Sequence, residues 1–159
     1  MLMPGETFSA SYPAVADAVP QARGALTEFA REAGARGERL EAVQLAASEA
    51  ITNAVMHAYQ DSQPGEVQVS ASYVEDELWL LVSDTGRGLR SRGRSSGLGL
   101  GLALIAQLAD EFQILSRGSG GTELRMRFSL ARDAAEVDGR RPERFGRLRP
   151  PARSHTLAR

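Results

Sequence analysis

The spacing of apolar residues changes several times along the chain, and each change marks the boundary of a predicted element. Alternation with a period of two, or a short apolar run, is typical of strands, whereas recurrence every three or four residues is typical of helices. These patterns predict strands at 6–12, 67–73, 78–82, 112–115 and 124–128. They predict helices at 15–33, 39–59 and 97–110, with Pro20 in the first regular turn of the first helix.

The order of these elements favours one fold class. Strands and helices do not alternate as βαβ units, so a parallel doubly wound sheet is not expected. The order strand, helix, helix, hairpin, glycine-rich loop, helix, hairpin predicts an α/β (α+β) two-layer sandwich, with an antiparallel or mixed sheet and the helices on one face. The weakly alternating first strand is expected at a sheet edge, and the continuous apolar run LWLLV, residues 78–82, in the centre. Residues 75–77, Glu-Asp-Glu, are expected at a hairpin tip, although they lack an Asn-Gly or Asp-Gly pair.

Composition divides the chain into a domain and a tail. The 159 residues fit one domain with a full hydrophobic core, predicted at residues 5–131. Residues 132–159 contain eight arginines, four acidic residues and three prolines with almost no apolar periodicity, which predicts an Arg-rich disordered tail. Such a tail either contacts an acidic partner or nucleic acid, or is simply solvated. The formal net charge of -1 gives no global signal for nucleic acid, and no direct nucleic-acid contact is expected.

Several classes of site are excluded by residue types that are missing. The sequence has no cysteine, which excludes disulfides and thiolate metal sites, and its two histidines are far apart. All 19 basic residues are arginines, so a P-loop, which needs a Gly-Lys pair, is excluded. No basic segment followed by an apolar run begins the sequence, and no apolar run is long enough to span a membrane. A cytoplasmic protein without membrane contact is therefore expected.

The predicted helix at 39–59 carries a polar stripe. Glu49, Asn53 and His57 are four residues apart, so they share one helical face, opposite apolar residues that can pack on a sheet. The stripe is either a solvated face or a site built on a rigid element. His57 has no assignable chemical role.

Two glycine-containing segments follow this helix. Asp84, Gly86 and Gly88 come directly after the apolar run at 78–82, where an aspartate can accept a hydrogen bond from an exocyclic amine such as that of adenine. Gly97, Gly99 and Gly101 open the last predicted helix, where glycines let phosphate approach the free N–H groups. Taken alone, each segment is also compatible with a turn or a close packing contact.

The three segments in this order resemble the N, G1 and G2 boxes of the GHKL ATP-binding superfamily, whose fold is the Bergerat ATP-binding fold. SEAITNAVMHAY, DTGRGL and GLGLALIAQLADEF are most similar to the bacterial anti-sigma-factor serine/threonine kinases of the RsbW/SpoIIAB type. The resemblance covers about residues 5 to 130. It implies ATP or ADP as ligand and Mg²⁺ as cofactor.

The resemblance also implies roles for individual residues. Glu49 matches the catalytic carboxylate and Asn53 the magnesium-chelating asparagine, while Asp84 matches the adenine-reading aspartate. Thr122 matches a threonine that helps to hold the adenine end. The remaining cofactor-binding positions are the glycines of the two boxes and the leucines beside them: Gly86, Gly88, Gly97, Gly99, Leu100, Gly101 and Leu102.

One departure from the superfamily pattern concerns the segment between Gly88 and Gly97. It is short, so the lid over the triphosphate is reduced, which puts phosphotransfer in question more than nucleotide binding. Arg90, Arg92 and Arg94 lie in it, and each of them either contacts phosphate or is solvated.

The function that the resemblance implies is an ATP-dependent anti-sigma factor. Such a protein binds a sigma factor and phosphorylates a STAS-type anti-anti-sigma protein on serine or threonine. It is also expected to form a homodimer, with the surface between Phe8 and Phe29 as the interface. The alternatives are an ATP/ADP-dependent regulatory binding module without phosphotransfer, and a stand-alone histidine-kinase ATPase domain.

Overall fold

Five strands and three helices make up the part of the chain that the structure describes. This structure is a computed structural model, and it describes residues 2–58, 65–86, 98–118 and 120–131. In chain order the elements are β1 (Thr7–Pro13), α1 (Ala18–Glu32), α2 (Gly37–Ala58), β2 (Glu66–Val74), β3 (Glu77–Asp84), α3 (Leu98–Leu108), β4 (Glu111–Ser116) and β5 (Thr122–Ser129). The predicted tail at 132–159 lies outside the described residues, so the division into domain and tail stays a prediction.

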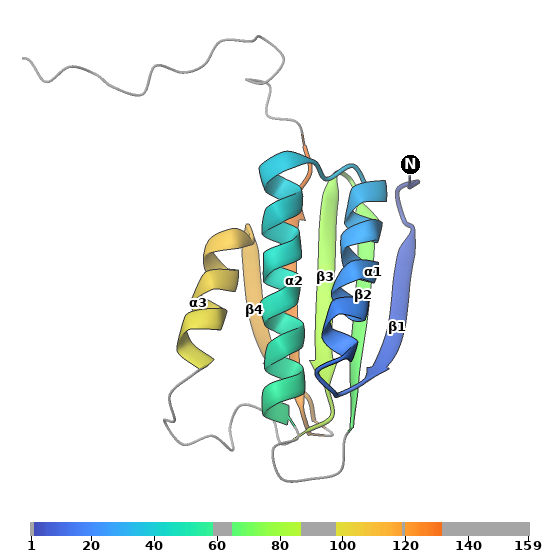
Figure 1. Ribbon diagram of the computed structural model, residues 1–159. Coiled ribbons are helices and arrows are strands. Elements are labelled where there is room, and N and C mark those ends of the chain that lie inside the picture. The colour runs from blue at the N-terminus through green and yellow to red at the C-terminus, as the bar shows by residue number, and fades with distance from the viewer. Residues whose placement is uncertain (1, 59–64, 87–97, 119, 132–159) are drawn as a thin grey trace, which may run out of the picture.

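The strands form one antiparallel sheet in the order β1-β2-β3-β5-β4. The register pairs Val69 with Val82 and Val82 with Leu124, which places apolar side chains from three neighbouring strands in one row. The helices cover this face of the sheet (Figure 1). The predicted two-layer α+β class, the edge position of the first strand and the central position of the run at 78–82 are all confirmed.

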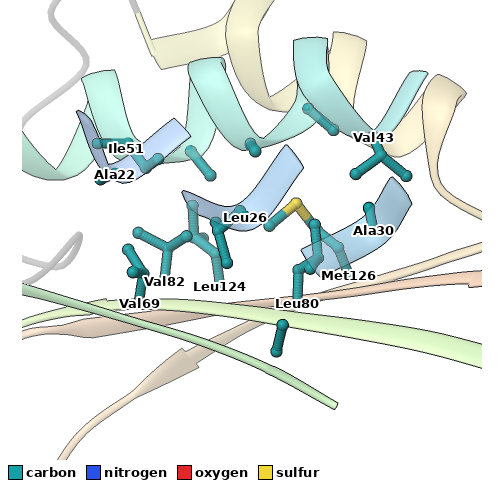
Figure 2. Packing of buried hydrophobic residues seen from close by; sticks show 14 of the residues in the cluster. Ala22, Leu26, Ala30, Val43, Ile51, Val69, Leu80, Val82, Leu124 and Met126 are labelled. Atoms are coloured by element: carbon teal, nitrogen blue, oxygen red, sulfur yellow. The ribbon is translucent and has the colours of Figure 1, made fainter. Parts of the chain in front are cut away.

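The core lies between the sheet and the two long helices. Leu26 of α1 and Ile51 of α2 are fully buried, as are Leu80 of β3 and Met126 of β5 (Figure 2). The helices α1 and α2 are in contact, and both contain alanines with no exposed surface, whose small side chains suit close packing: Ala22, Ala30, Ala46, Ala47 and Ala50. The helix α2 is therefore fixed in position from two sides.

Among the described residues, no helix combines the length and the apolar character that a membrane span requires.

The hairpin between β2 and β3 turns without glycine. Glu75 and Asp76 have φ angles of 50° and 61°, the left-handed values that a two-residue turn of this kind demands. Asp76 is also tied to its surroundings, because the Tyr73 hydroxyl donates to its Oδ1 at 2.8 Å and Leu130 N donates to its carbonyl at 2.7 Å. The hydrogen bond to the Asp76 carboxylate raises the pKa of Tyr73. Glu75 is therefore the position where the turn can be changed without losing a contact.

The substitution Glu75→Asn is expected to stabilise the protein. Asparagine tolerates the left-handed conformation better than glutamate, so the free energy of unfolding should rise by about 0.5 kcal/mol in urea denaturation. The control is Glu75→Ala, which removes the same charge but gains no tolerance for positive φ. An equal gain in the alanine variant would show that charge repulsion with the neighbouring acids, and not backbone strain, limits the hairpin.

Candidate nucleotide site

Three elements present their functional ends at the same end of the molecule. The carboxyl end of α2, the carboxyl end of β3 and the start of α3 all lie at the lower end of the molecule in Figure 1. The start of β5 joins them, because β5 runs antiparallel to β3. Segments that are far apart in the sequence are thus assembled into one site.

The polar stripe of α2 packs against a glycine of α3. A methyl group on Gly101 would lie 2.8 Å from Glu49 Oε2, and 3.5 Å and 3.7 Å from the Nδ2 and Oδ1 atoms of Asn53. Glu49 and Asn53 therefore both lie against the backbone of α3, as the four-residue spacing predicts. The carboxylate and the amide occupy the space that a larger residue at position 101 would fill.

The side-chain amide of Asn53 has an unsatisfied donor. Its Nδ2 atom is buried and has no hydrogen-bond partner among the described residues. Buried polar groups in proteins are nearly always hydrogen-bonded, so an unpaired one marks a place where a polar ligand or water can bind. Asn53 is thus suited to contact a ligand between α2 and α3.

The carboxylate of Asp84 is held at the end of β3. Asp84 is 7% exposed, and its Oδ1 accepts a hydrogen bond of 2.8 Å from the backbone N–H of Gly86. This two-residue pattern is an Asx-turn, which orients the carboxylate. The preceding residue, Ser83, is equally buried, and its hydroxyl accepts from Arg117 Nη1 at 3.4 Å.

The glycine pair before β5 packs on the backbone of this turn. Gly121 has a φ of +89°, and a methyl group there would lie 2.0 Å from the carbonyl oxygen of Asp84. Gly120 has a φ of +92° and a looser contact of 3.6 Å with the carbonyl oxygen of Gly86. The register pairs Ser83 with Glu123, so the next position along places the buried Thr122 beside Asp84. The glycines thus hold the Thr122 and Asp84 backbones close together.

Sequence reasoning missed Gly121 as a site residue. The pair Gly120-Gly121 has a sequence pattern typical of a turn, and it does lie between β4 and β5. The signal that could have singled out Gly121 is its place directly before Thr122, a predicted adenine-end residue.

Other predicted site residues are placed only in part. Leu100 is 88% exposed in the first turn of α3, whereas Leu102 is partly buried and packs on the core. Gly99 lies in α3 and His57 in α2, and the structure does not describe the His57 side chain. The predicted positions Gly88, Gly97, Arg90, Arg92 and Arg94 lie outside the described residues. The roles of all these residues stay predictions.

The first turn of α3 favours an anion. It contains no acidic residue, and the N-terminal N–H groups of a helix carry partial positive charge. Within the described part of the chain, no three His, Asp or Glu side chains are grouped so that they could hold a metal ion.

A sequence profile of the histidine kinase-like ATPase domain matches residues 12–128. Serine-protein kinase RsbW of Oceanobacillus iheyensis is 30% identical over 141 residues, which cover 79% of this chain and 88% of that protein. RsbW of Listeria innocua is 33% identical over 117 residues, or 64% of this chain and 74% of its own length. The anti-sigma F factor of Clostridium novyi is 28% identical over 120 residues, covering 69% and 84% of the two chains.

A solved structure is also similar. The structure of the RsbU and RsbW domains of Rv1364c from Mycobacterium tuberculosis matches with a TM-score of 0.61 and 27% sequence identity. The match covers 79% of this chain but 32% of that one, so this chain spans about a third of that larger protein. The similarity therefore concerns one part of a multidomain chain.

Proposed function

This chain belongs to the histidine kinase-like ATPase domain family, and we propose that within it the protein is an ATP-dependent anti-sigma factor with serine/threonine kinase activity. Relatives named serine-protein kinase RsbW and anti-sigma F factor support an anti-sigma kinase role. In the full proposal the protein binds a sigma factor and phosphorylates a STAS-type anti-anti-sigma protein on serine or threonine. Such a regulator would work in the cytoplasm, where sigma factors act.

The observation that carries the proposal is the meeting of Glu49 and Asn53 at Gly101. A carboxylate and an amide with an unsatisfied donor lie side by side against a helix whose first turn favours anions. Asp84 and Thr122 supply a second polar pair at the end of the sheet. A nucleotide site needs one group of residues for the phosphates and another for the base. Glu49 and Asn53 would serve the phosphates, and Asp84 and Thr122 the base.

The residues present fit magnesium and ATP. The Asn53 amide offers a carbonyl oxygen, a hard ligand of the kind magnesium prefers, and its buried donor lacks a partner among the described residues. Magnesium commonly takes few protein ligands and completes its shell with waters and phosphate oxygens. Magnesium ATP would supply the γ-phosphoryl group and neutralise charge on the phosphates.

The protein's own residues would then do three things. Asp84 would accept a hydrogen bond from the exocyclic amine of adenine, and Thr122 would hold the same end. The N–H groups at the start of α3 would bind phosphate oxygens. Glu49 would accept the proton of the partner's serine or threonine hydroxyl, as that oxygen bonds to the γ-phosphorus and the bond to the bridging oxygen of ADP breaks.

The homodimer is part of the proposal, with β1 and α1 as its surface. The rings of Phe8 and Phe29 are 6.3 Å apart and tilted by 38°, which joins the edge strand to the helix. Phe29 itself is 7% exposed, so it supports the surface from within and leaves the contact to outward residues of β1 and α1. Light scattering should give twice the mass of one chain, and a single-chain mass at micromolar concentration would contradict the dimer.

The kinase proposal is tested by transfer of label. The protein is incubated with ATP labelled at the γ-phosphate, magnesium and each STAS protein encoded near its gene. A labelled STAS band is expected, and it should disappear when the accepting serine or threonine is replaced by alanine. If the protein binds ATP but labels no STAS candidate, the regulatory binding module without phosphotransfer is the better description.

The substitution Asp84→Asn tests adenine recognition. Asparagine can still accept the Gly86 N–H through its Oδ1, so the turn should persist, but its amide group cannot accept from the adenine amine. The loss of a charged hydrogen bond should weaken ATP binding about 10- to 100-fold in a fluorescence titration. The control Asp17→Asn removes an exposed charge that makes no side-chain hydrogen bond to cap α1. Equal affinity in both variants would remove Asp84 from the adenine site.

A further inference from the structure

Gly101 differs from an ordinary glycine in a helix. It lies inside α3 without adopting a left-handed conformation, so backbone freedom does not explain it. A glycine at an interior helix position costs about 1 kcal/mol relative to alanine. The reason for glycine must therefore be the absence of a side chain.

The absent side chain makes room for one atom in particular. A methyl group on Gly101 would lie 2.8 Å from Glu49 Oε2, which is closer than carbon and oxygen tolerate. The two Asn53 atoms, at 3.5 Å and 3.7 Å, would remain in ordinary van der Waals contact. Alanine at position 101 would therefore displace the Glu49 carboxylate and leave the Asn53 amide where it is.

The helix α3 cannot easily move aside instead. Ile105 lies one turn after Gly101, on the same side of α3, and it is fully buried in the core. Shifting α3 away from α2 would pull Ile105 out of its packing, whereas rotating the end of the Glu49 side chain costs less. The carboxylate is thus the part that yields.

We propose that Gly101 is a positioning residue for the carboxylate of Glu49. This inference rests on the proposed function, in which Glu49 accepts the proton of the partner's hydroxyl. The glycine acts through Glu49, because its missing side chain sets how closely the carboxylate lies against α3. Gly101 thereby serves the phosphotransfer step, separately from any contact with phosphate by the glycines before it.

The matched control is Gly24, a glycine within α1 whose added methyl group would meet nothing within 4 Å. Gly24→Ala should raise the melting temperature by about 2–4 °C through helix propensity. Because Gly24 is exposed on α1, part of the proposed dimer surface, light scattering must show the same mass for this variant as for the unchanged protein before its phosphotransfer rate serves as the reference. Gly101→Ala keeps the backbone N–H of residue 101, so its affinity for ADP with magnesium, measured beside the rate, should fall much less than the rate does. Its single-turnover phosphotransfer should be at least about 30-fold slower, because a displaced base loses much of the 100-fold or more that general bases contribute.

Rescue by a shorter carboxylate separates positioning from general damage. Glu49→Asp withdraws the carboxylate by one methylene, which leaves space for a methyl group on residue 101. The double variant Gly101→Ala/Glu49→Asp should therefore be no slower than the Glu49→Asp variant alone, which is a non-additive result. If the double variant is slower than Glu49→Asp by the full factor that Gly101→Ala causes alone, the inference is overturned and the kinase proposal stays intact.

A second measurement needs no phosphotransfer at all. In the protein with Glu49, Gly101→Ala should raise the melting temperature less than Gly24→Ala does. In a Glu49→Ala background, the two substitutions should raise the melting temperature by equal amounts. If the shift caused by Gly101→Ala does not depend on residue 49, the inference fails whatever the kinase assay shows. If the shift does depend on it but the unchanged protein labels no STAS candidate, the proposed phosphotransfer fails and the contact between Gly101 and Glu49 stands.

Discussion

Gly121→Ala is expected to destabilise the fold and to abolish most nucleotide binding. The residue has a φ of +89°, where any L side chain is strained by about 1–2 kcal/mol. Its added methyl group would also lie 2.0 Å from the carbonyl oxygen of Asp84 and 2.8 Å from the carbonyl carbon. These are backbone atoms of β3, so relief requires the strand end or the loop before β5 to move. The free energy of unfolding should fall by about 3 kcal/mol or more in urea denaturation.

Nucleotide affinity should fall with it. Moving the end of β3 would displace the Asp84 carboxylate, and with the proposed role of Asp84 in adenine binding this should weaken ADP binding about 10- to 100-fold, as the loss of a charged hydrogen bond does. The neighbouring Gly120 is a close control, because it has a similar φ of +92° but only a 3.6 Å contact with Gly86. Gly120→Ala should therefore show the conformational strain without the overlap. Equal losses in the two variants would mean that backbone strain alone explains the effect.

The layered fold follows from local patterns. The run at 78–82 was expected in the centre of the sheet, and β3 has neighbours on both sides. Its inward residues Leu78, Leu80 and Val82 are fully buried, while Trp79 and Leu81 on the other face are partly buried. A strand with apolar side chains on both faces is stable only where neighbouring strands and their side chains shield the open face from water. This is why an unbroken apolar run predicts position as well as conformation.

The candidate site was predictable to the extent that one element determines it. Glu49 and Asn53 share a face because they are four residues apart on one helix, and the structure brings both to Gly101. The profile match to residues 12–128 confirms the superfamily that the three boxes indicated. The individual roles in catalysis and binding stay predictions.

The rest of the site depends on contacts between distant segments. The sequence pattern of Gly120-Gly121 is typical of any hairpin turn. The neighbouring residues do not indicate that the Asp84 carbonyl oxygen lies 2.0 Å from where a side chain of residue 121 would begin. The same holds for Gly101. The glycine spacing predicts a phosphate contact, which stays a prediction, but it does not indicate that Glu49 Oε2 lies 2.8 Å from where a side chain of residue 101 would begin. Sequence spacing predicts which residues share a face, but the partner of that face comes from packing.

Glu49→Gln is expected to produce the largest loss of activity with the smallest loss of structure. Glutamine has nearly the same shape as glutamate, so it can keep the position against Gly101, but it cannot accept a proton at neutral pH. Phosphotransfer to a STAS partner should fall about 100- to 10,000-fold, the usual contribution of a general base. The affinity for ADP with magnesium should stay within about threefold, because the residues proposed to recognise the base are Asp84 and Thr122, not Glu49.

Single-turnover transfer of labelled phosphate, with saturating ATP, measures this step directly. The control is Glu41→Gln, which removes an exposed carboxylate two turns earlier on α2 and should leave the rate unchanged. A loss of ADP affinity equal to the loss of rate would make Glu49 a nucleotide ligand. A rate equal to that of the unchanged protein would place the base elsewhere. The proposed role of Glu49, a carboxylate held in place by α2 and Gly101 for proton transfer, requires a Glu49→Gln variant that is slow but still binds nucleotide.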